Sequence, residues 1–290
     1  MKIREVIERV LAYHPPFPAD YDGCDGFKCG DPEAECTGIA VALVPTVDAI
    51  RRAAEAGCNL LYVHEPTNFT SLDKPGWDLD YENKVFAAKQ KLLEETGITI
   101  FRDHDHMHAH RPDSIFSGVI RYLGWEPYYK PEDSTVPMGF VFELPEMTVR
   151  ELAEYLMEKL PMNGVRFVGN PEDKVRRVAI TGHLLPDFGG CYGHDEHGVW
   201  HEYGTEVIRG MESGVDAIIP GEVIEWTALS YVRDAVALGF TKAVINIGHF
   251  SMEELGMRNA RDYLTELTQG QVPVVYLEGK DMYSFLKKGE

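Results

Sequence analysis

The sequence predicts an α/β protein made of two similar lobes, with mixed or parallel sheets covered by helices. Short β-rich runs alternate with helical stretches from residue 37 onward, and features of the first half recur in the second half. Alternating strands and helices favour a parallel or mixed sheet with helices on its faces. A length of 290 residues and a hydrophobic fraction of 44% suit a soluble globular chain with two such lobes.

The first predicted element is an amphipathic helix at the start of the chain. In MKIREVIERVLAYHPP, apolar residues recur at helical spacing, with charges between them that a signal peptide would exclude. Seven strands are predicted, at 37–44, 59–63, 98–102, 177–181, 216–220, 242–247 and 273–277. Helical patterns lie between most of these strands. Apolar runs such as AVALV are too short to span a bilayer, so no membrane association is expected.

An internal repeat supports two related lobes. Residues 55–66 resemble residues 212–223, and residues 96–104 resemble residues 238–249. In the first pair a glycine precedes a strand whose far end carries a carboxylate, Glu65 or Glu222; in the second pair the far end carries a histidine. Two such matches in the same order favour a duplicated unit.

The predicted division has an N-terminal α/β lobe over 1–125, a C-terminal α/β lobe over 173–290 and a short bridge over 126–172. The bridge has polar flanks and a strand and a helix (149–160) of its own. Open α/β sheets hold ligands at the carboxyl ends of their strands, so we expect the functional site in the crevice between the lobes.

Charge and cysteine content limit the partners. A formal net charge of −19 repels phosphate backbones and attracts cations, so direct nucleic-acid binding is not expected. The five cysteines form no CxxC pair, and their odd number argues against a disulfide framework. The expected location is the cytoplasm, and the expected partner is a small-molecule substrate.

Residues 101–113, FRDHDHMHAHRPD, concentrate four histidines. A helix would place His104 and His108 on one face, whereas an extended chain would align His104, His106, His108 and His110. Either geometry brings at least two imidazoles together, and imidazoles near acidic groups are good ligands for divalent transition metals. The alternative is a solvent-exposed polar turn.

Two further strand ends carry residues of the ligand type. His64 and Glu65 follow an apolar strand, and His249 and Glu253 stand four apart after another. Neighbouring strand residues face opposite sides, so His64 and Glu65 reach one metal only if the backbone turns, although they could serve two metals. The alternatives are a capped strand end and a glutamate that favours a helix N-terminus.

The predicted metal ligands are His64, Glu65, His104, His108, His249 and Glu253. No thiolate is among them. A structural zinc site needs four ligands and usually includes cysteine, whereas imidazoles with carboxylates leave positions open for water and substrate. Six such ligands suit a pair of divalent ions, with Zn, Fe and Mn as the candidates.

Four stretches together resemble a known family. They are YDGCDGFKCGDP (21–32), His64-Glu65-Pro66, HDHMH (104–108) and the GHxxxE pattern of Gly248, His249 and Glu253. They are similar to the WDNxGLQVG-like, HHP, HTNLD-like and GHxxxE motifs of the NIF-three-like dinuclear metal-centre proteins, the GTP cyclohydrolase I type 2 family. The resemblance covers most of the chain and implies the same six ligands. In this chain Glu65 replaces a histidine and His108 replaces an aspartate.

The resemblance implies two α/β lobes around a dimetal site and a homo-oligomer, a hexamer built as a trimer of dimers. It also places the TGE segment of the family on PGE, with Glu222. The leading hypothesis is a metal-dependent hydrolase in which Glu222 and His183 transfer protons or support the ligands. The substrate would carry a cyclic C–N bond of a purine nucleotide or a phosphoester.

Two alternatives remain open at this point. One is a non-catalytic metal-binding, regulatory or scaffold protein that forms a ring oligomer. The other is a structural role in which the histidines hold the lobes together, so that chelation would unfold the chain.

Residues 189–204, a glycine-rich loop with His194, His197 and His201, are a weaker candidate for substrate binding. HGVWH has the histidine spacing of HExxH, but Gly198 replaces the required glutamate, which argues against a metalloprotease. The alternative is a flexible surface loop. The chain has no GxxxxGK[ST] motif, which argues against P-loop nucleotide hydrolysis.

Overall fold

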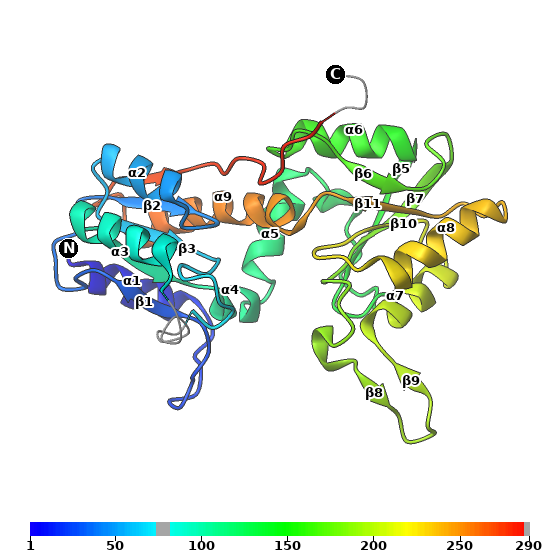
Figure 1. Cartoon of the computed structure of the whole chain (residues 1–290), viewed down its shortest axis with the longest axis horizontal. Helices are drawn as coiled ribbons and strands as arrows, with labels where there is room; N and C mark the ends of the chain where they lie inside the picture. Colours follow the sequence, from blue (N-terminus) through cyan, green and yellow to red (C-terminus); the bar gives the residue numbers. More distant parts are fainter. Residues whose placement is uncertain (74–81, 287–290) are drawn as a thin grey trace. The chain divides into compact units, whose positions relative to one another are not determined.

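The computed structural model describes residues 1–73 and 82–286. The chain divides into two compact units, shown in Figure 1. The first unit comprises Met1–Val119 and Glu253–Gly279, and the second comprises Ile120–Met252 and Lys280–Glu290. Each unit contains a mixed sheet covered by helices, which confirms the predicted fold class.

The sheet of the first unit has the strand order β1-β4-β3-β2-β12. Its strands are β1 (Gly26–Cys29), β2 (Ile39–Ala42), β3 (Leu60–Val63), β4 (Thr99–Arg102) and β12 (Val274–Tyr276). β12, β2, β3 and β4 run parallel, and β1 lies antiparallel to β4. Val63 pairs with Ala42 on one side and with Arg102 on the other. The residues that follow β3 and β4 therefore leave the sheet at the same edge.

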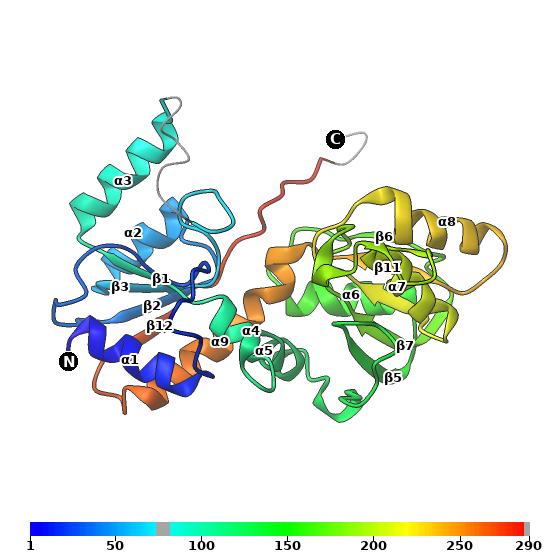
Figure 2. The ribbon, with the colours of Figure 1, turned by 90° about the horizontal axis from the view of Figure 1, so that it is seen from below.

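Helices cover both faces of this sheet (Figure 2). The helices of this unit are α1 (Ile3–Tyr13), α2 (Val47–Glu55), α3 (Lys84–Thr96), the short α4 (Asp105–Ala109), α5 (Ser114–Tyr122) and α9 (His249–Leu267), of which α5 and α9 extend into the second unit. α2 and α3 lie on one face, and α1 and α9 lie on the other.

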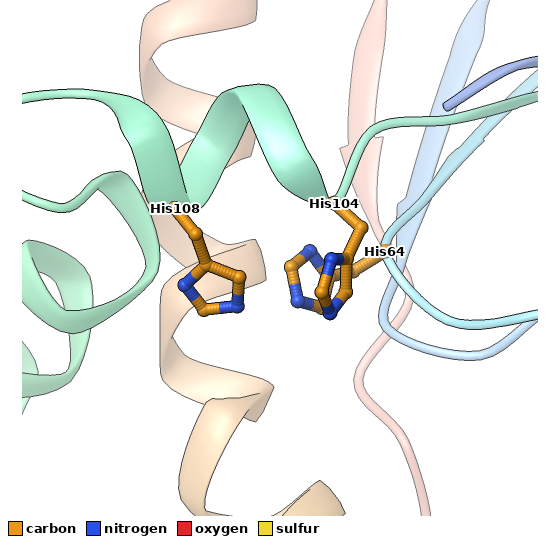
Figure 3. A group of neighbouring side chains, drawn as sticks. All are labelled: His64, His104 and His108. Carbon is orange, nitrogen blue, oxygen red and sulfur yellow. The ribbon is translucent and has the colours of Figure 1, made fainter. Parts of the chain in front are cut away.

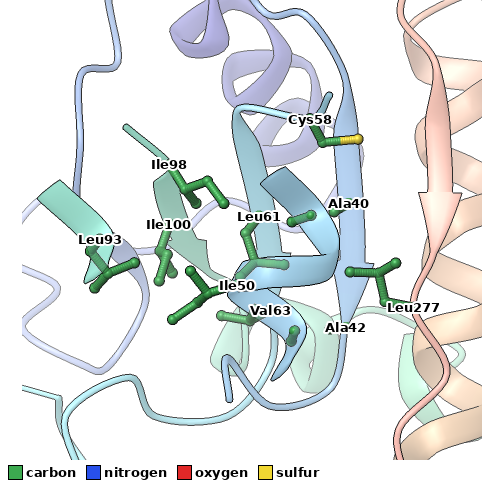
Figure 4. Packing of buried hydrophobic residues seen from close by; sticks show 12 residues of the cluster. Ala40, Ala42, Ile50, Cys58, Leu61, Val63, Leu93, Ile98, Ile100 and Leu277 are labelled. Carbon is green, nitrogen blue, oxygen red and sulfur yellow. The ribbon is translucent and has the colours of Figure 1, made fainter. Parts of the chain in front are cut away.

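Strand alternation explains why both faces are apolar. Leu61 and Val63 of β3 point toward α2 and α3, where they pack with Ile50 and Leu93 (Figure 4). Tyr62 points to the opposite face, where its hydroxyl lies 2.8 Å from the hydroxyl of Tyr263 on α9. β2, β3 and β4 are buried at every position, as expected for parallel strands with helices on both sides.

The second unit has the strand order β5-β7-β10-β11-β6. Its sheet consists of β5 (Phe140–Thr148), β6 (Arg166–Val168), β7 (Lys174–Ile180), β10 (Ala217–Ile219) and β11 (Ala243–Asn246). β7, β10 and β11 are parallel, and β5 and β6 are antiparallel edge strands. The remaining elements are α6 (Val149–Lys159), α7 (Tyr203–Glu212), α8 (Ser230–Ala237), the π-helix η3 (Glu225–Leu229), the 3-10 turns η1 (Glu126–Tyr128) and η2 (Phe188–Gly190), and the hairpin β8 (Gly193–His194) and β9 (Trp200–His201).

The sheets of the two units contain the same arrangement of strands. Each has three adjacent parallel strands in the order β2-β3-β4 or β7-β10-β11, and an antiparallel strand, β1 or β6, beside the third. The internal repeat of the sequence falls on β3 and β10 and on β4 and β11, so it corresponds to equivalent places in the two sheets.

The unit boundaries differ from the division predicted from sequence. The segment 126–172, expected to be a bridge, supplies β5, α6 and β6 to the second unit, because β5 pairs with β7 and β6 pairs with β11. The strand predicted at 273–277 forms β12 and pairs with β2 in the first unit, although it was expected in the C-terminal lobe. In both places, pairing with strands that are distant in the sequence determines the unit to which the segment belongs.

All seven predicted strands and the N-terminal helix are confirmed in position. Within residues 1–73 and 82–286, no helix has the length and apolarity needed to cross a membrane.

A buried lysine secures the loop that follows β3. Lys89 of α3 is 5% exposed, donates from Nζ to the carbonyl oxygen of Thr67 at 2.7 Å and lies 5.1 Å from the centre of the Phe69 ring. Burial is the main reason that the pKa of Lys89 falls to about 8 from an ordinary 10.5. Between these two values the unfolded chain binds a proton that the folded chain lacks, so stability rises with pH.

The substitution Lys89→Met tests this linkage. From pH 8 to pH 10 the free energy of unfolding of the wild type should rise relative to that of the variant by about 1 kcal/mol per pH unit. Urea unfolding at several pH values measures the difference. Lys91→Met is the matched control, because the Lys91 side chain is 75% exposed. If the stabilities of the wild type and of Lys89→Met change in parallel as the pH rises, the lowered pKa assigned to Lys89 is contradicted.

Candidate metal centre

The first candidate ligands lie directly after β3. The His64 side chain is fully buried, and Glu65 is 6% exposed. The backbone N–H groups of both residues donate to the carbonyl oxygen of Leu43, at 3.1 and 2.9 Å. Because both amides reach the same acceptor, the backbone turns here, and His64 and Glu65 no longer face opposite sides of a strand.

The next candidates lie on α4, which follows β4. His104 occupies the N-cap position, and His108 lies in the last turn. Of the two geometries that the sequence allowed, the helix is the one that forms, and its spacing of four residues brings these two imidazoles to one side. His106 points elsewhere, with Nδ1 2.6 Å from Oδ2 of Asp25.

His64, His104 and His108 converge, as Figure 3 shows. The ring centres of His64 and His104 are 4.4 Å apart, and those of His104 and His108 are 4.8 Å apart. One nitrogen from each of the three rings lies within 4.8 Å of the other two. β3 and α4 therefore bring three imidazoles to one point at the edge of the sheet.

In each of these imidazoles, Nδ1 is held by an oxygen atom. The partners are the Asp103 carbonyl oxygen for His64 at 3.0 Å, Asp105 Oδ1 for His104 at 2.8 Å and Asp113 Oδ2 for His108 at 2.9 Å. An acceptor at Nδ1 fixes the tautomer in which Nδ1 carries the proton and Nε2 is left as a ligand. Oriented imidazoles of this kind are typical of metal sites.

Carboxylates complete the group. Glu253 is 4% exposed, and its Oε2 lies 3.5 Å from Nε2 of His64. Ligand atoms of His64, Glu65 and Glu253 all lie within 4.8 Å of one another. Nε2 of His64 is buried and makes no hydrogen bond to the described residues. A buried nitrogen without a hydrogen bond destabilises the folded chain, and coordination to a divalent ion would remove this penalty. These residues therefore fit a metal.

The charges near the imidazoles set their protonation. Burial and the neighbouring His64 lower the pKa of His104, which keeps it neutral at physiological pH. Burial alone would lower the pKa of His108, but the hydrogen bond and charge of Asp113 outweigh it and raise the pKa to about 8. The hydrogen bond from His104 holds the pKa of Asp105 well below its usual range.

The other three predicted residues lie together in the second unit. His183, Glu222 and His249 follow β7, β10 and β11, three adjacent parallel strands. Nδ1 of His249 lies 3.4 Å from Oε1 of Glu222, and Nδ1 of His183 accepts the backbone N–H of Glu222 at 3.0 Å. The rings of His183 and His249 are 4.4 Å apart. Five predicted ligands thus gather in the first unit, and the sixth, His249, lies beside both predicted proton-transfer residues.

Sequence reasoning missed residues in the segment before β1. Cys24 forms a further potential ligand group with His104 and Asp105. Burial raises the pKa of the Cys24 thiol, so it is protonated at neutral pH. Asp25 and Tyr21 also contact α4 or the residues beside it. The only signal for this segment was its loose match to a family motif, which assigned none of these contacts.

The glycine-rich stretch at 189–204 contains the β8–β9 hairpin. The imidazole of His201 lies between Oε1 of Glu206 at 2.7 Å and Oδ2 of Asp195 at 3.1 Å. These two carboxylates raise the pKa of His201. His194 packs its ring on Trp200, and His197 is exposed. The described structure does not bring the three histidines together in a metal-ligand group.

The fold and the site define a mixed α/β protein with an imidazole and carboxylate cluster at the carboxyl edge of its first sheet. The family model Duf34/NIF3 (NGG1p interacting factor 3) matches residues 1–183, more than half of the chain. The protein belongs to the Duf34/NIF3 family, as the motifs in its sequence predicted.

Known relatives cover almost the whole chain. The GTP cyclohydrolase 1 type 2 homolog of Clostridium perfringens is 25% identical over 296 residues, which cover 99% of this chain and all of that protein. The protein of the same name from Clostridium acetobutylicum is 26% identical over 260 residues, 87% of this chain and 85% of that protein. The crystal structure of a Bacillus cereus protein related to NIF3 matches with a TM-score of 0.70 and 16% identity over 99% of both chains. That structure supports the fold alone.

The substitution Asp113→Asn tests the electrostatics of the site. The amide oxygen can still cap α5, because asparagine is a good N-cap residue, but the charge opposite His108 is lost. The pKa of His108 in the metal-free protein should therefore fall from about 8 toward its ordinary 6.5. Histidine titration by NMR measures it, with Asp48→Asn as the control for an exposed charge. A His108 pKa that stays near 8 would contradict the account.

Proposed function

We propose that this protein binds two divalent transition-metal ions, with Zn, Fe and Mn as candidates, and acts as a metal-dependent hydrolase on a small molecule. The observation that carries the proposal is the convergence of three imidazoles whose Nδ1 atoms are all held by oxygen acceptors. Such imidazoles are built to present Nε2 to a metal. His64, His104 and His108 would ligate, Glu65 and Glu253 would ligate or bridge, and His249 would be the sixth ligand.

The donor set favours a catalytic site over a purely structural one. Imidazoles and carboxylates leave open coordination positions, and a divalent ion in such a site lowers the pKa of water toward neutrality and stabilises developing negative charge. Asp105 and Asp113 would keep His104 and His108 oriented throughout. Glu222 and His183 would transfer protons, because carboxylates and imidazoles are common general acids and bases in enzymes.

The substrate class comes from the relatives. Two homologues carry the name GTP cyclohydrolase 1 type 2 homolog, which suggests a cyclic C–N bond of a purine nucleotide. A phosphoester is the second substrate class suited to a pair of divalent ions. We further propose a cytoplasmic homo-oligomer, a hexamer built as a trimer of dimers, which light scattering of the purified chain would test.

The substitution Glu253→Gln separates a catalytic from a non-catalytic metal protein. Turnover of a cyclic amide, nucleotide or phosphoester should fall by about 100-fold or more, because a carboxylate is lost from the centre. The free energy of unfolding should stay close to that of the wild type. Exposed Glu94→Gln is the control, with unchanged turnover. A metal-loaded wild type that turns over nothing in a broad panel of these substrates would favour a binding or regulatory role instead.

Metal removal distinguishes a functional from a structural site. Metal analysis of the purified chain should find two equivalents per protomer, and fewer than one would contradict the dinuclear proposal. Chelation should remove the metal while circular dichroism still reports a folded chain, because both units have extensive apolar cores of their own. Unfolding on chelation would instead assign the histidines a structural role.

A further inference from the structure

The helix that carries two of the three imidazoles is too short to be stable by itself. α4 has only five residues, whereas isolated helices below about 12 residues are marginal in water. Its N-cap residue, His104, makes no side-chain capping bond. Something outside the helix must satisfy its first N–H groups and hold it in place.

Asp25 provides that cap from about 80 residues away in the sequence. Its Oδ1 accepts the backbone N–H groups of His104 at 2.7 Å and Asp105 at 3.0 Å. Its Oδ2 accepts the backbone N–H of His106 at 2.9 Å and lies 2.6 Å from Nδ1 of the same residue. The Asp25 side chain is 3% exposed. One carboxylate thus accepts three successive backbone N–H groups at the start of α4 and places a negative charge at its N-terminus.

The same segment also holds the acceptor of His104. The Tyr21 hydroxyl donates to Oδ2 of Asp105 at 2.6 Å, while Oδ1 of Asp105 holds Nδ1 of His104. The backbone N–H of Asp25 donates to the Tyr21 hydroxyl at 3.1 Å, which links the two contacts. At Gly23 a Cβ atom would clash with Oδ2 of Asp105, so a larger residue there would displace this carboxylate.

We infer that Asp25, supported by Tyr21, is a positioning residue that holds His104 and His108 in the geometry needed to bind a metal. This inference rests on the proposed function, because it assumes that these imidazoles are ligands. Asp25 acts through the backbone of α4, and Tyr21 acts through the carboxylate of Asp105. Without Asp25, α4 loses its cap, and the two imidazoles lose their fixed relation to His64.

The test compares metal affinity among variants of the full chain. Metal-free protein is titrated with Zn²⁺ against a chromophoric chelator, and with Co²⁺ while its visible absorption is recorded. Asp25→Ala should weaken Zn²⁺ binding by about 10- to 100-fold, as expected for loss of a group that orients ligands, and should change the Co²⁺ spectrum. Asp25→Asn should recover only part of the affinity, because its amide oxygen still accepts the N–H groups of His104 and Asp105, whereas its NH2 group cannot accept from His106.

Two controls separate positioning from general damage. Asp20→Ala removes an exposed carboxylate of the same segment and should bind Zn²⁺ as the wild type does. Leu93→Ala destabilises the apolar core of the first unit, away from α4, and should also leave Zn²⁺ affinity unchanged while the chain is folded. If Asp25→Ala does not fold, Tyr21→Phe tests the same inference through Asp105, with an expected loss of several-fold.

The outcomes distinguish this inference from the proposed function. A folded Asp25→Ala variant with wild-type Zn²⁺ affinity and Co²⁺ spectrum would overturn the inference and leave the metal centre intact. Wild-type affinity in Tyr21→Phe would overturn it in the same way if the alanine variant does not fold. A wild type that binds neither ion would overturn the proposed function itself, and the inference with it.

Discussion

The candidate centre depends on the hydrogen bonds that hold Nδ1 of three imidazoles. A free histidine side chain rotates and exchanges tautomers, and three of them would rarely present the same nitrogen to one point. Here a backbone carbonyl oxygen holds His64, and carboxylates hold His104 and His108. These side chains lose their conformational freedom when the chain folds. Metal binding therefore requires no further ordering of them and is stronger than it would be with freely rotating side chains.

Parallel strands explain why these residues meet. β3 and β4 are neighbours, and their register aligns the ends of both strands, so the residues that follow leave the sheet side by side. His64 is the first residue after β3, whereas β4 is followed by a short helix that carries His104 at its N-cap and His108 in its last turn. Apolar packing on both faces fixes the strands, and the candidate ligands His64, His104 and His108 follow the edge where the strands end.

The parts of the structure with a local signal could be predicted from the sequence. Buried parallel strands are nearly continuous apolar runs, so β2, β3 and β4 were visible, as were the histidines and acids that follow them. β1 was missed because its residues are all half-buried and show no alternation. The unit that β12 joins was predicted incorrectly because it is decided by pairing with β2, more than 200 residues away in the sequence.

Contacts between distant segments account for what was missed in the site. The turn that lets His64 and Glu65 converge depends on a carbonyl oxygen of Leu43, and the cap of α4 depends on Asp25; neither residue type signals such a role in the sequence.

Anomalous diffraction from crystals of the full chain grown with Zn²⁺ tests the account most directly. We predict a zinc peak bounded by Nε2 of His64, His104 and His108. Crystals in which zinc is bound only elsewhere, while these three nitrogens have no metal between them, would contradict it.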